Sequence, residues 1–133
     1  MTQSQVALIS GASRGIGAAT AKTLFDAGWC VSLGMRTPVM PDWAETAPER
    51  VHLFAYDATE VASPVQWADA VMKAWGRIDA VVANAGITIT KTPIDITNEE
   101  MAQLLEVNVQ GPRRFAAACW DALAQSGKGR VII

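Results

Sequence analysis

A glycine-rich segment between a short apolar run and an amphipathic stretch limits the possible folds most. The run Val6–Ile9 has the length and continuous apolar character of a parallel strand that is buried on both faces. It leads into residues 10–17, Ser-Gly-Ala-Ser-Arg-Gly-Ile-Gly, and a helix is predicted from about Gly15 to Ala27, where Gly28 stops it. A strand, a tight glycine turn and a helix in this order are typical of an α/β fold that binds a phosphate group at the helix N-terminus.

The rest of the chain repeats this alternation of strand and helix. Apolar runs predict strands over residues 29–35, 51–56 and 79–83, and a fifth strand begins at Arg130. Residues 37–50 hold three prolines, so we expect a loop there with at most a turn or two of helix. The order predicts an α/β fold, a doubly wound parallel sheet in three α/β/α layers, with the chain ending at the fifth strand.

Two helices are predicted between the later strands. Ser63 is expected to cap the first, with Pro64 at its first position. Spacings of four and three residues predict its buried face, which consists of Val61, Val65, Ala68, Met72 and Trp75. Residues 97–100, Thr-Asn-Glu-Glu, have the form of a capping box that opens the second and longer helix. A bend is expected in that helix at Gly111-Pro112.

Composition and charge exclude several classes of protein. The 133 residues are 50% apolar, so the chain can bury a core and is not intrinsically disordered. A net charge of −2 gives no basic excess for a nucleic-acid partner, and no apolar run reaches the roughly 18–20 residues that cross a membrane. Cys30 and Cys119 are too few for a disulfide framework or a metal cluster, and residues 1–5 do not resemble a signal peptide. We therefore expect one domain, residues 1–133, in the reducing cytoplasm.

The three glycines of the first turn point to a dinucleotide. Gly11, Gly15 and Gly17 depart from the G-x-G-x-x-G spacing of the standard dinucleotide fingerprint but serve the same physical purpose. Glycine lets backbone N–H groups approach a pyrophosphate at the positive end of a helix, and the side chains of Ser13 and Arg14 add donors. A glycine-rich turn that binds nothing is the alternative.

The end of the second strand bears on the choice between NAD and NADP. An NAD site carries Asp or Glu there to bind the adenosine ribose, yet no acidic residue occurs over residues 31–37. Arg36, with Arg14 from the glycine turn, could bind a 2′-phosphate through charge-assisted hydrogen bonds. A solvated surface arginine is the alternative for Arg36. The missing acid is the firmer observation, and it favours NADP over NAD.

Three more positions are candidates for the same site. Asp57 follows the third strand and could accept a hydrogen bond from an adenine amino group, with Ala58 adding a main-chain contact. Asn84-Ala85-Gly86 follows the fourth strand, where small residues would let the backbone lie against a ribose. Asn108 falls on a helix among apolar neighbours, where an amide needs buried partners or a functional reason. Ordinary turns at the first two positions and a structural asparagine at the third are the alternatives.

Taken in order along the chain, these motifs resemble the short-chain dehydrogenase/reductase family. They lie at residues 11–17, Asp57, residues 84–86 and residues 107–111, and residues 127–133 are similar to the family's entry into its fifth strand. The resemblance implies a Rossmann-type fold and NADP(H)-dependent hydride transfer to or from a carbonyl or alcohol. The substrate within that class is not specified by these motifs.

The resemblance also implies a role for each matching residue. The pyrophosphate and adenosine ribose would be lined by Gly11, Ser13, Arg14, Gly15, Ile16 and Gly17. Arg36 would meet the 2′-phosphate, and Asp57 with Ala58 would meet the adenine. The nicotinamide-side ribose would be bordered by Asn84, Ala85 and Gly86, with Val107 nearby. Asn108 matches the family's catalytic asparagine, which bends the helix and holds a water in the proton relay.

The family's other catalytic groups have no counterpart in this sequence. Its acid/base tyrosine, the lysine four residues later and the serine that polarises the carbonyl all lie beyond the fifth strand. The single tyrosine, Tyr56, is followed four residues later by Glu60, and its neighbour Asp57 would raise the phenol pKa. His52 falls in a predicted strand and is expected to be structural. We therefore expect the chain to be truncated before the catalytic serine and Tyr-x-x-x-Lys.

Three interpretations follow. The residues are the N-terminal portion of an NADP-dependent oxidoreductase, or a nucleotide-binding module without turnover, or a fragment that persists by association with another chain. The long helix favours association as a homodimer or homotetramer, because it resembles the helix through which family members dimerise. Its small-residue apolar surface consists of Phe115, Ala116, Ala118, Cys119, Ala122 and Leu123, and packing of part of this surface on the chain's own sheet is the alternative.

Overall fold

Five strands form one parallel sheet in the computed structural model, which describes residues 3–133. Their bounds are Val6–Ser10 for β1, Cys30–Met35 for β2, Val51–Ala55 for β3, Ala80–Val82 for β4 and Arg130–Ile132 for β5. They lie in the order β3-β2-β1-β4-β5, and every neighbouring pair is parallel. The chain builds outward from β1 to one edge and then returns to its other side, which confirms the predicted doubly wound α/β fold.

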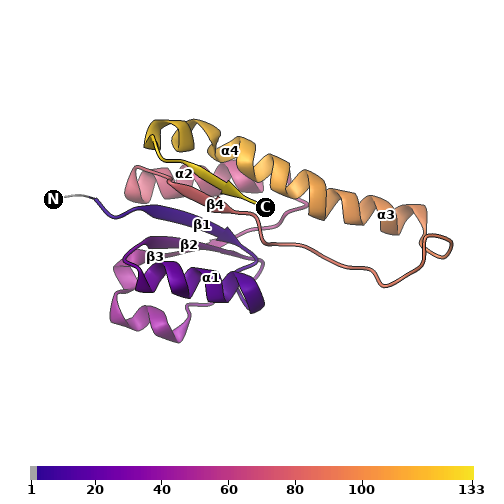
Figure 1. Cartoon of the computed structure of the whole chain (residues 1–133), viewed down its shortest axis with the longest axis horizontal. Helices are drawn as coiled ribbons and strands as arrows, with labels where there is room; N and C mark the ends of the chain where they lie inside the picture. Colours follow the sequence, from indigo (N-terminus) through magenta and orange to yellow (C-terminus); the bar gives the residue numbers. More distant parts are fainter. Residues whose placement is uncertain (1–2) are drawn as a thin grey trace.

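Helices cover both faces of this sheet and complete the three predicted layers (Figure 1). Helix α1, Gly15–Asp26, lies on one face together with two short 3-10 turns, η1 at Asp42–Thr46 and η2 at Pro48–Arg50. Helices α2, Ser63–Trp75, and α4, Gly111–Ser126, lie on the opposite face. The two short turns are the only helix in the proline-containing loop of the described chain, as predicted.

β1 is the central strand, and all five of its residues are buried. Its side chains alternate between two apolar cores, as the pleat of a strand requires. Val6 and Leu8 join the core under α2 and α4, while Ala7 and Ile9 join the core under α1. A strand buried on both faces has no polar side to show, which is why its sequence is a continuous apolar run.

The prediction that Ser63 caps α2 is wrong. Ala62 occupies the cap position, no side chain caps the helix, and Ser63 is its first residue. The hydroxyl of Ser63 instead accepts a hydrogen bond from the backbone N–H of Asp57, with an N–O distance of 3.2 Å. The hydroxyl is therefore used to hold the end of β3 to the start of α2.

The predicted buried face of α2 is also partly wrong. Val61 and Val65 are exposed, and the inward side chains are Pro64, Trp67, Ala68 and Val71. Both sets follow helical spacing, so the pattern alone permits either. The second set is buried because the ring of Trp67 lies over Gly34 of β2. A Cβ atom at position 34 would come within 2.5 Å of that ring, so a side chain there would displace it.

The second long helix has an irregular turn in its middle. The capping box forms as predicted, since Thr97 Oγ1 accepts from Glu100 N–H and the Glu100 carboxylate accepts from Thr97 N–H. Helix α3, Asn98–Leu105, then passes through one π-helical turn, η3 at Glu106–Gln110, into α4. The irregularity is centred on Asn108, just before the bend that was expected at Gly111-Pro112.

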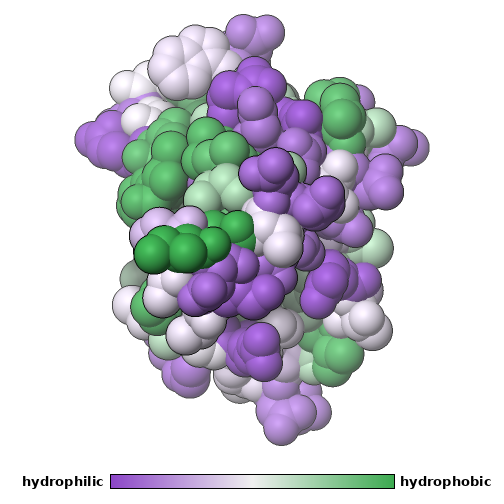
Figure 2. All heavy atoms as spheres, turned by 90° about the vertical axis from the view of Figure 1, so that its right-hand side faces the viewer, coloured by the Kyte–Doolittle hydropathy of each residue, from purple (hydrophilic) through white to green (hydrophobic). Residues whose placement is uncertain are grey.

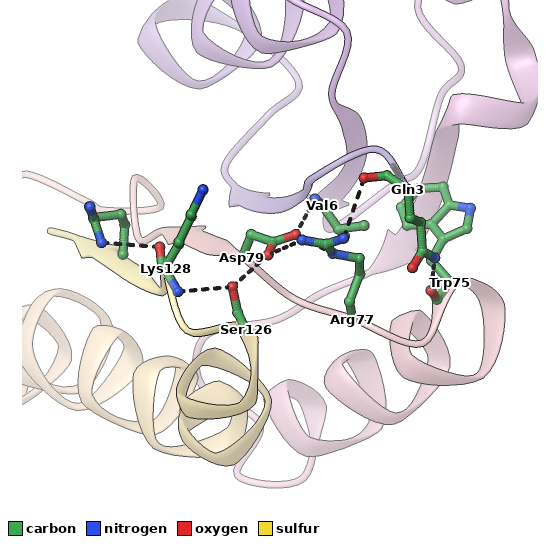
Figure 3. A network of polar contacts seen from close by, with 8 residues as sticks. Gln3, Val6, Trp75, Arg77, Asp79, Ser126 and Lys128 are labelled. Atoms are coloured by element: carbon green, nitrogen blue, oxygen red, sulfur yellow. Dashed lines mark hydrogen bonds and ion pairs between the residues drawn. The ribbon is translucent and has the colours of Figure 1, made fainter. Parts of the chain in front are cut away.

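A buried carboxylate joins several elements at the end of the sheet where the strands begin (Figure 3). The side chain of Asp79 is fully buried. Its Oδ2 accepts hydrogen bonds from the N–H of Val6 and from Arg77 Nε, both at 2.8 Å. Its Oδ1 accepts from Arg77 Nη2 at 2.7 Å and from the hydroxyl of Ser126 at 2.5 Å. This network fastens β1, the start of β4 and the end of α4 together.

Burial alone would raise the pKa of Asp79. The hydrogen bonds from Arg77, Ser126 and the N–H of Val6, with the positive charge of Arg77, outweigh that effect and hold the pKa below its usual value. The carboxylate is therefore charged and fully paired inside the protein, and its role is structural.

β5 ends the described chain at the edge of the sheet, and its three residues are exposed. Within residues 3–133, no helix has both the length and the apolar character needed to span a bilayer. The same residues contain no group of three or more His, Cys, Asp or Glu side chains that could hold a metal ion.

Candidate functional site

The glycine-rich turn lies where β1 ends, beside the end of β2. The N–H groups of Gly11 and Ala12 both donate to the carbonyl oxygen of Gly34, at 3.0 and 3.3 Å, which fixes the first half of the turn. Gly11 and Gly15 have φ values of +65° and +60°, in the region that favours glycine. A Cβ at Gly15 would meet nothing within 4 Å, so this part of the turn faces open space.

Gly17 lets the first turn of α1 approach the neighbouring backbone closely. A Cβ there would lie 2.2 Å from the carbonyl oxygen of Gly11 and 2.6 Å from Nδ2 of Asn84. Asn84 Nδ2 donates to that same Gly11 oxygen at 3.1 Å. The glycine turn and the segment after β4, which are separated by about 70 residues in sequence, are therefore in direct contact.

Ser10 is a residue of this site that sequence reasoning missed. Its buried hydroxyl oxygen accepts from the N–H groups of Asn84 and Ala85, both at 3.0 Å, and the hydroxyl donates to the carbonyl of Val82 at 3.4 Å. It thus fixes the backbone of Asn84-Ala85-Gly86 to the end of β1. A hydroxyl residue at the end of an otherwise apolar, buried strand was the available signal.

The side chains at the N-terminus of α1 are open to solvent. Ser13, Arg14, Gly15 and Ile16 are all exposed, whereas Gly17 is buried. Arg14 holds the cap position with an extended backbone and no capping side-chain hydrogen bond, and the first turn has no acidic residue. The N–H groups of this turn, the helix dipole and the Arg14 guanidinium therefore offer positive charge and donors to an anion.

Asp57 and Arg36 lie near each other at the ends of β3 and β2. Oδ1 of Asp57 accepts from the hydroxyl of Thr59 at 2.7 Å and from the N–H of Thr59 at 2.9 Å. These two bonds hold the pKa of Asp57 below its usual value against the opposing effect of burial, and the positive charge of Arg36 contributes in the same direction as the bonds. Arg36 is exposed, and β2 ends without an acidic residue. The carboxylate is therefore charged and fixed in direction by Thr59, a second residue that sequence reasoning missed.

Asn108 ties the π-helical turn to the segment after Gly86. Its Oδ1 accepts from the N–H of Ile87 at 2.9 Å, and its Nδ2 donates to the carbonyl of Ile87 at 2.8 Å. Both polar ends of the amide are thus paired, although the residue as a whole is exposed rather than buried among apolar neighbours. Short π-helical turns inside α-helices occur frequently at functional sites. The expected departure from regular helix therefore occurs at Asn108 itself.

Three of the remaining candidate residues pack together beneath the exposed residues of the site. Ala58, Ala85 and Val107 line one gap beside Ser10 and Gly111 that is too small to hold a water molecule. These residues form close packing that supports the surface rather than a cavity. Figure 2 looks onto the end of the molecule where the strands finish, and hydrophilic residues occupy much of the middle of this view.

The structure gives neither Tyr56 nor His52 the environment of a catalytic acid or base. Burial and the adjacent Asp57 carboxylate raise the pKa of Tyr56 to about 12, in the direction expected from the sequence. Its ring packs against Trp67 and Phe115 in the core. His52 lies within β3 with Nδ1 2.8 Å from the hydroxyl of Ser32, and burial lowers its pKa.

Comparisons with known proteins agree with this geometry. A family model described as short chain dehydrogenase matches residues 5–133. An agropine synthesis reductase of Rhizobium rhizogenes is 34% identical over 98% of this chain, and sulfoacetaldehyde reductase 2 of Chromohalobacter salexigens is 28% identical over 98%. The matches cover 31% and 53% of those two relatives, so the chain spans just under a third of the first and about half of the second.

Solved structures match along nearly the whole chain. A short-chain dehydrogenase from Streptomyces avermitilis superposes with a TM-score of 0.91 at 30% identity, covering 98% of this chain and 48% of the other. An alcohol dehydrogenase from the archaeon Thermococcus sibiricus, complexed with 5-hydroxy-NADP, gives 0.85 at 32% identity, covering 97% and 57%. With its sheet order, its glycine turn and the family match over residues 5–133, the chain belongs to the short-chain dehydrogenase family.

Proposed function

We propose that this chain binds NADP(H) where its strands end and is the cofactor-binding portion of an oxidoreductase that acts on a carbonyl or alcohol substrate. When bound, the cofactor supplies or accepts the hydride. Oxidoreductase function follows from the family, while the cofactor preference and the substrate class are our inference.

The residues of the glycine turn fit a dinucleotide. Gly17 keeps the first turn of α1 close to the backbone of Gly11, and open space lies over Gly15. The uncapped N-terminus of α1 and the side chains of Ser13 and Arg14 would hold the pyrophosphate. The backbone of Asn84, Ala85 and Gly86, which Ser10 and Asn84 fasten to β1, would border the nicotinamide-side ribose, with Val107 behind it.

The single observation that carries the preference for NADP is the end of β2. No acidic residue lies there to accept hydrogen bonds from a ribose 2′-hydroxyl, and Arg36 is exposed at that position. Arg36 and Arg14 would bind the 2′-phosphate through charge-assisted hydrogen bonds. A solved relative that is complexed with an NADP analogue is consistent with this preference.

Substitution Arg36→Ala tests the preference. The variant should lose about 1.5–3 kcal/mol of NADPH binding free energy, because one charge-assisted contact disappears. Its affinity for NADH should change little, since NADH lacks the 2′-phosphate. Calorimetric titration of both cofactors into both proteins measures this difference, and an equal loss for the two cofactors would refute the proposed role of Arg36.

The same portion could instead bind a nucleotide without turnover. The observation that favours this second function is Tyr56, whose phenol is buried with its pKa raised to about 12 and has Glu60 rather than lysine four residues later. Asn108 is the one catalytic residue of the family that these 133 residues match. NADPH binding without oxidation by any small aldehyde or ketone would support this alternative, and carbonyl-dependent NADPH oxidation would exclude it.

We also propose that the chain forms a homodimer or homotetramer, in the cytoplasm, through the outer side of α3 and α4. Met101 and Leu105 on α3, Val109 on the π-helical turn η3 and Trp120 on α4 are exposed apolar residues, the first three at four-residue spacing. Of the surface predicted from sequence, Phe115, Cys119 and Leu123 are buried in the chain's own core and are not available.

Sedimentation equilibrium tests this proposal. It should show a dimer or tetramer that Leu105→Glu weakens, because the substitution places a charge among the exposed apolar residues. An unchanged mass for the variant would rule out this surface.

A further inference from the structure

We propose that Thr59 is a positioning residue that aims the carboxylate of Asp57 at the amino group of the cofactor's adenine. The inference rests on the proposed NADP(H) site and adds a residue that the motifs do not include. Thr59 itself is exposed and touches Asp57 rather than the adenine in this assignment.

The two hydrogen bonds from Thr59 go to one oxygen of the carboxylate. Oδ1 of Asp57 accepts from Thr59 Oγ1 at 2.7 Å and from Thr59 N–H at 2.9 Å. Oδ2 has no hydrogen-bond partner among residues 3–133 and remains available to a ligand. A carboxylate held at one oxygen and open at the other can accept a hydrogen bond from a donor in a defined direction.

The backbone of Asp57 is fixed as well as its side chain. Its N–H donates to the hydroxyl of Ser63 at 3.2 Å, and its carbonyl accepts from the N–H of Glu60 at 3.1 Å. Thr59 therefore acts on a residue that is already anchored, and its contribution is to the rotation of the carboxylate. Without the hydroxyl, Oδ1 keeps only the bond from the Thr59 N–H, so the carboxylate is held less firmly in its orientation.

The charges around Asp57 matter for the pH dependence of this arrangement. Arg36 at the end of β2 and the two Thr59 donors favour the charged carboxylate, and the adjacent titratable group is the buried phenol of Tyr56. Glu60 is the next acidic residue along the chain and is exposed. Removing the Thr59 hydroxyl would raise the pKa of Asp57, so protonation would compete with ligand binding at a higher pH.

The experiment compares NADPH with its analogue in which hypoxanthine replaces adenine, so that a carbonyl oxygen stands in place of the amino group. The unmodified chain should prefer NADPH by about tenfold or more, because a hydrogen bond to a charged acceptor is lost with the analogue. In Thr59→Val this preference should fall by about three- to tenfold, as the acceptor is no longer held in place. As the pH is lowered, the affinity of Thr59→Val for NADPH should also begin to fall at a higher pH than that of the unmodified chain, which we call the acid limb of NADPH affinity.

Two variants control for a merely structural effect. Thr59→Ser keeps the hydroxyl and should restore both the preference and the acid limb. Thr92→Val removes a similar hydroxyl–carboxylate bond, from Thr92 Oγ1 to Asp95 at 2.6 Å, far along the chain from Asp57, and should leave both quantities unchanged. A Thr59→Val protein that binds NADPH with the full preference for adenine and an unshifted acid limb would overturn the proposal.

Asp57→Ala, which leaves no side-chain acceptor at this position, separates this inference from the proposed function. If that variant abolishes the preference for adenine while Thr59→Val keeps it, the assignment of Asp57 stands and the role of Thr59 is refuted. If Asp57→Ala keeps the preference, Asp57 does not bind the adenine and both assignments fail. An unmodified chain that does not bind NADPH at millimolar concentration would overturn the proposed function and the inference together.

Discussion

The two ends of the strands use similar residues in opposite ways. Where the strands begin, the carboxylate of Asp79 is fully buried and accepts four hydrogen bonds from Arg77, Ser126 and the backbone of Val6. Where they finish, the carboxylate of Asp57 is bonded at one oxygen only, and Arg14 and Arg36 are exposed. Each end thus contains an aspartate near an arginine. Among residues 3–133, an ion pair forms at the end where the strands begin, between Asp79 and Arg77, and none forms between Asp57 and Arg36.

The difference separates stability from binding. A buried charge is tolerated only when its hydrogen bonds are complete, so the network around Asp79 contributes to the fold and has little capacity left for a ligand. At the other end, solvent supplies the missing partners, and a ligand with phosphate groups and an adenine can replace that solvent. We therefore predict that substitutions where the strands begin change the free energy of unfolding and that substitutions where the strands finish change the affinity for NADPH.

The largest effect is expected for Asp79→Asn. The carboxylate is buried but Arg77 is partly exposed, so losing their charge pairing should lower the free energy of unfolding by about 3 kcal/mol, the lower end of the range for buried pairs. Asp26→Asn, which breaks the exposed pair with Lys22, should cost under about 0.5 kcal/mol. Urea unfolding followed by circular dichroism compares them, and similar costs for both variants would contradict a structural role for Asp79.

Gly17→Ala should lower both the free energy of unfolding and the affinity for NADPH. The new Cβ would lie 2.2 Å from the carbonyl oxygen of Gly11, so the turn must shift, at a cost of about 1–3 kcal/mol and at least tenfold in NADPH affinity. Gly15→Ala meets no neighbour and should cost about 1–2 kcal/mol, from its positive φ alone. If the Gly17 variant crystallises with an unmoved turn and full affinity, the close approach is not needed for binding.

Ser126→Ala should destabilise the protein less than Asp79→Asn, and the pH dependence of its effect tests whether the Asp79 carboxylate is charged. Losing one donor raises the pKa of Asp79 toward its ordinary value and should cost about 1–2 kcal/mol at neutral pH. A lowered pKa gives stability that is present above the unfolded-state value of about 3.9 and is lost as the pH falls through the folded-state value. The gap between the variant and the unmodified protein should therefore narrow below about pH 4. A gap that stays constant with pH would show that the charge is not involved.

The fold could be predicted from the sequence because each strand and turn has a local signal. The continuous apolar run of β1, the glycines after it and the capping box at Thr97 determine their own structure almost independently of the rest. All five strands were predicted to within about one residue of their ends, and the alternation of strand and helix predicted a doubly wound parallel sheet, although not the order of its strands.

Features that depend on tertiary contacts could not be predicted in this way. Helical spacing allows two faces for α2, and only the contact of Trp67 with Gly34 selects between them. Ser63 has the residue type of a cap, but its hydroxyl accepts from Asp57 instead. Likewise, Asp79 was read only as the first residue of a strand, since its partner Ser126 lies 47 positions away. The candidate site residues were predicted as a set from their motifs, whereas Ser10 and Thr59, whose hydrogen bonds reach Asn84, Ala85 and Asp57, lie outside those motifs.

The most direct test is an amide chemical-shift map of the ¹⁵N-labelled chain during titration with NADPH. We predict the largest shifts at residues 11–17, at Arg36, at residues 57–59 and at residues 84–86, where the strands finish. The amides around Asp79 and Ser126 should move little. Largest shifts at the latter residues, or no shifts at millimolar NADPH, would contradict the assignment of binding to one end of the sheet and stability to the other.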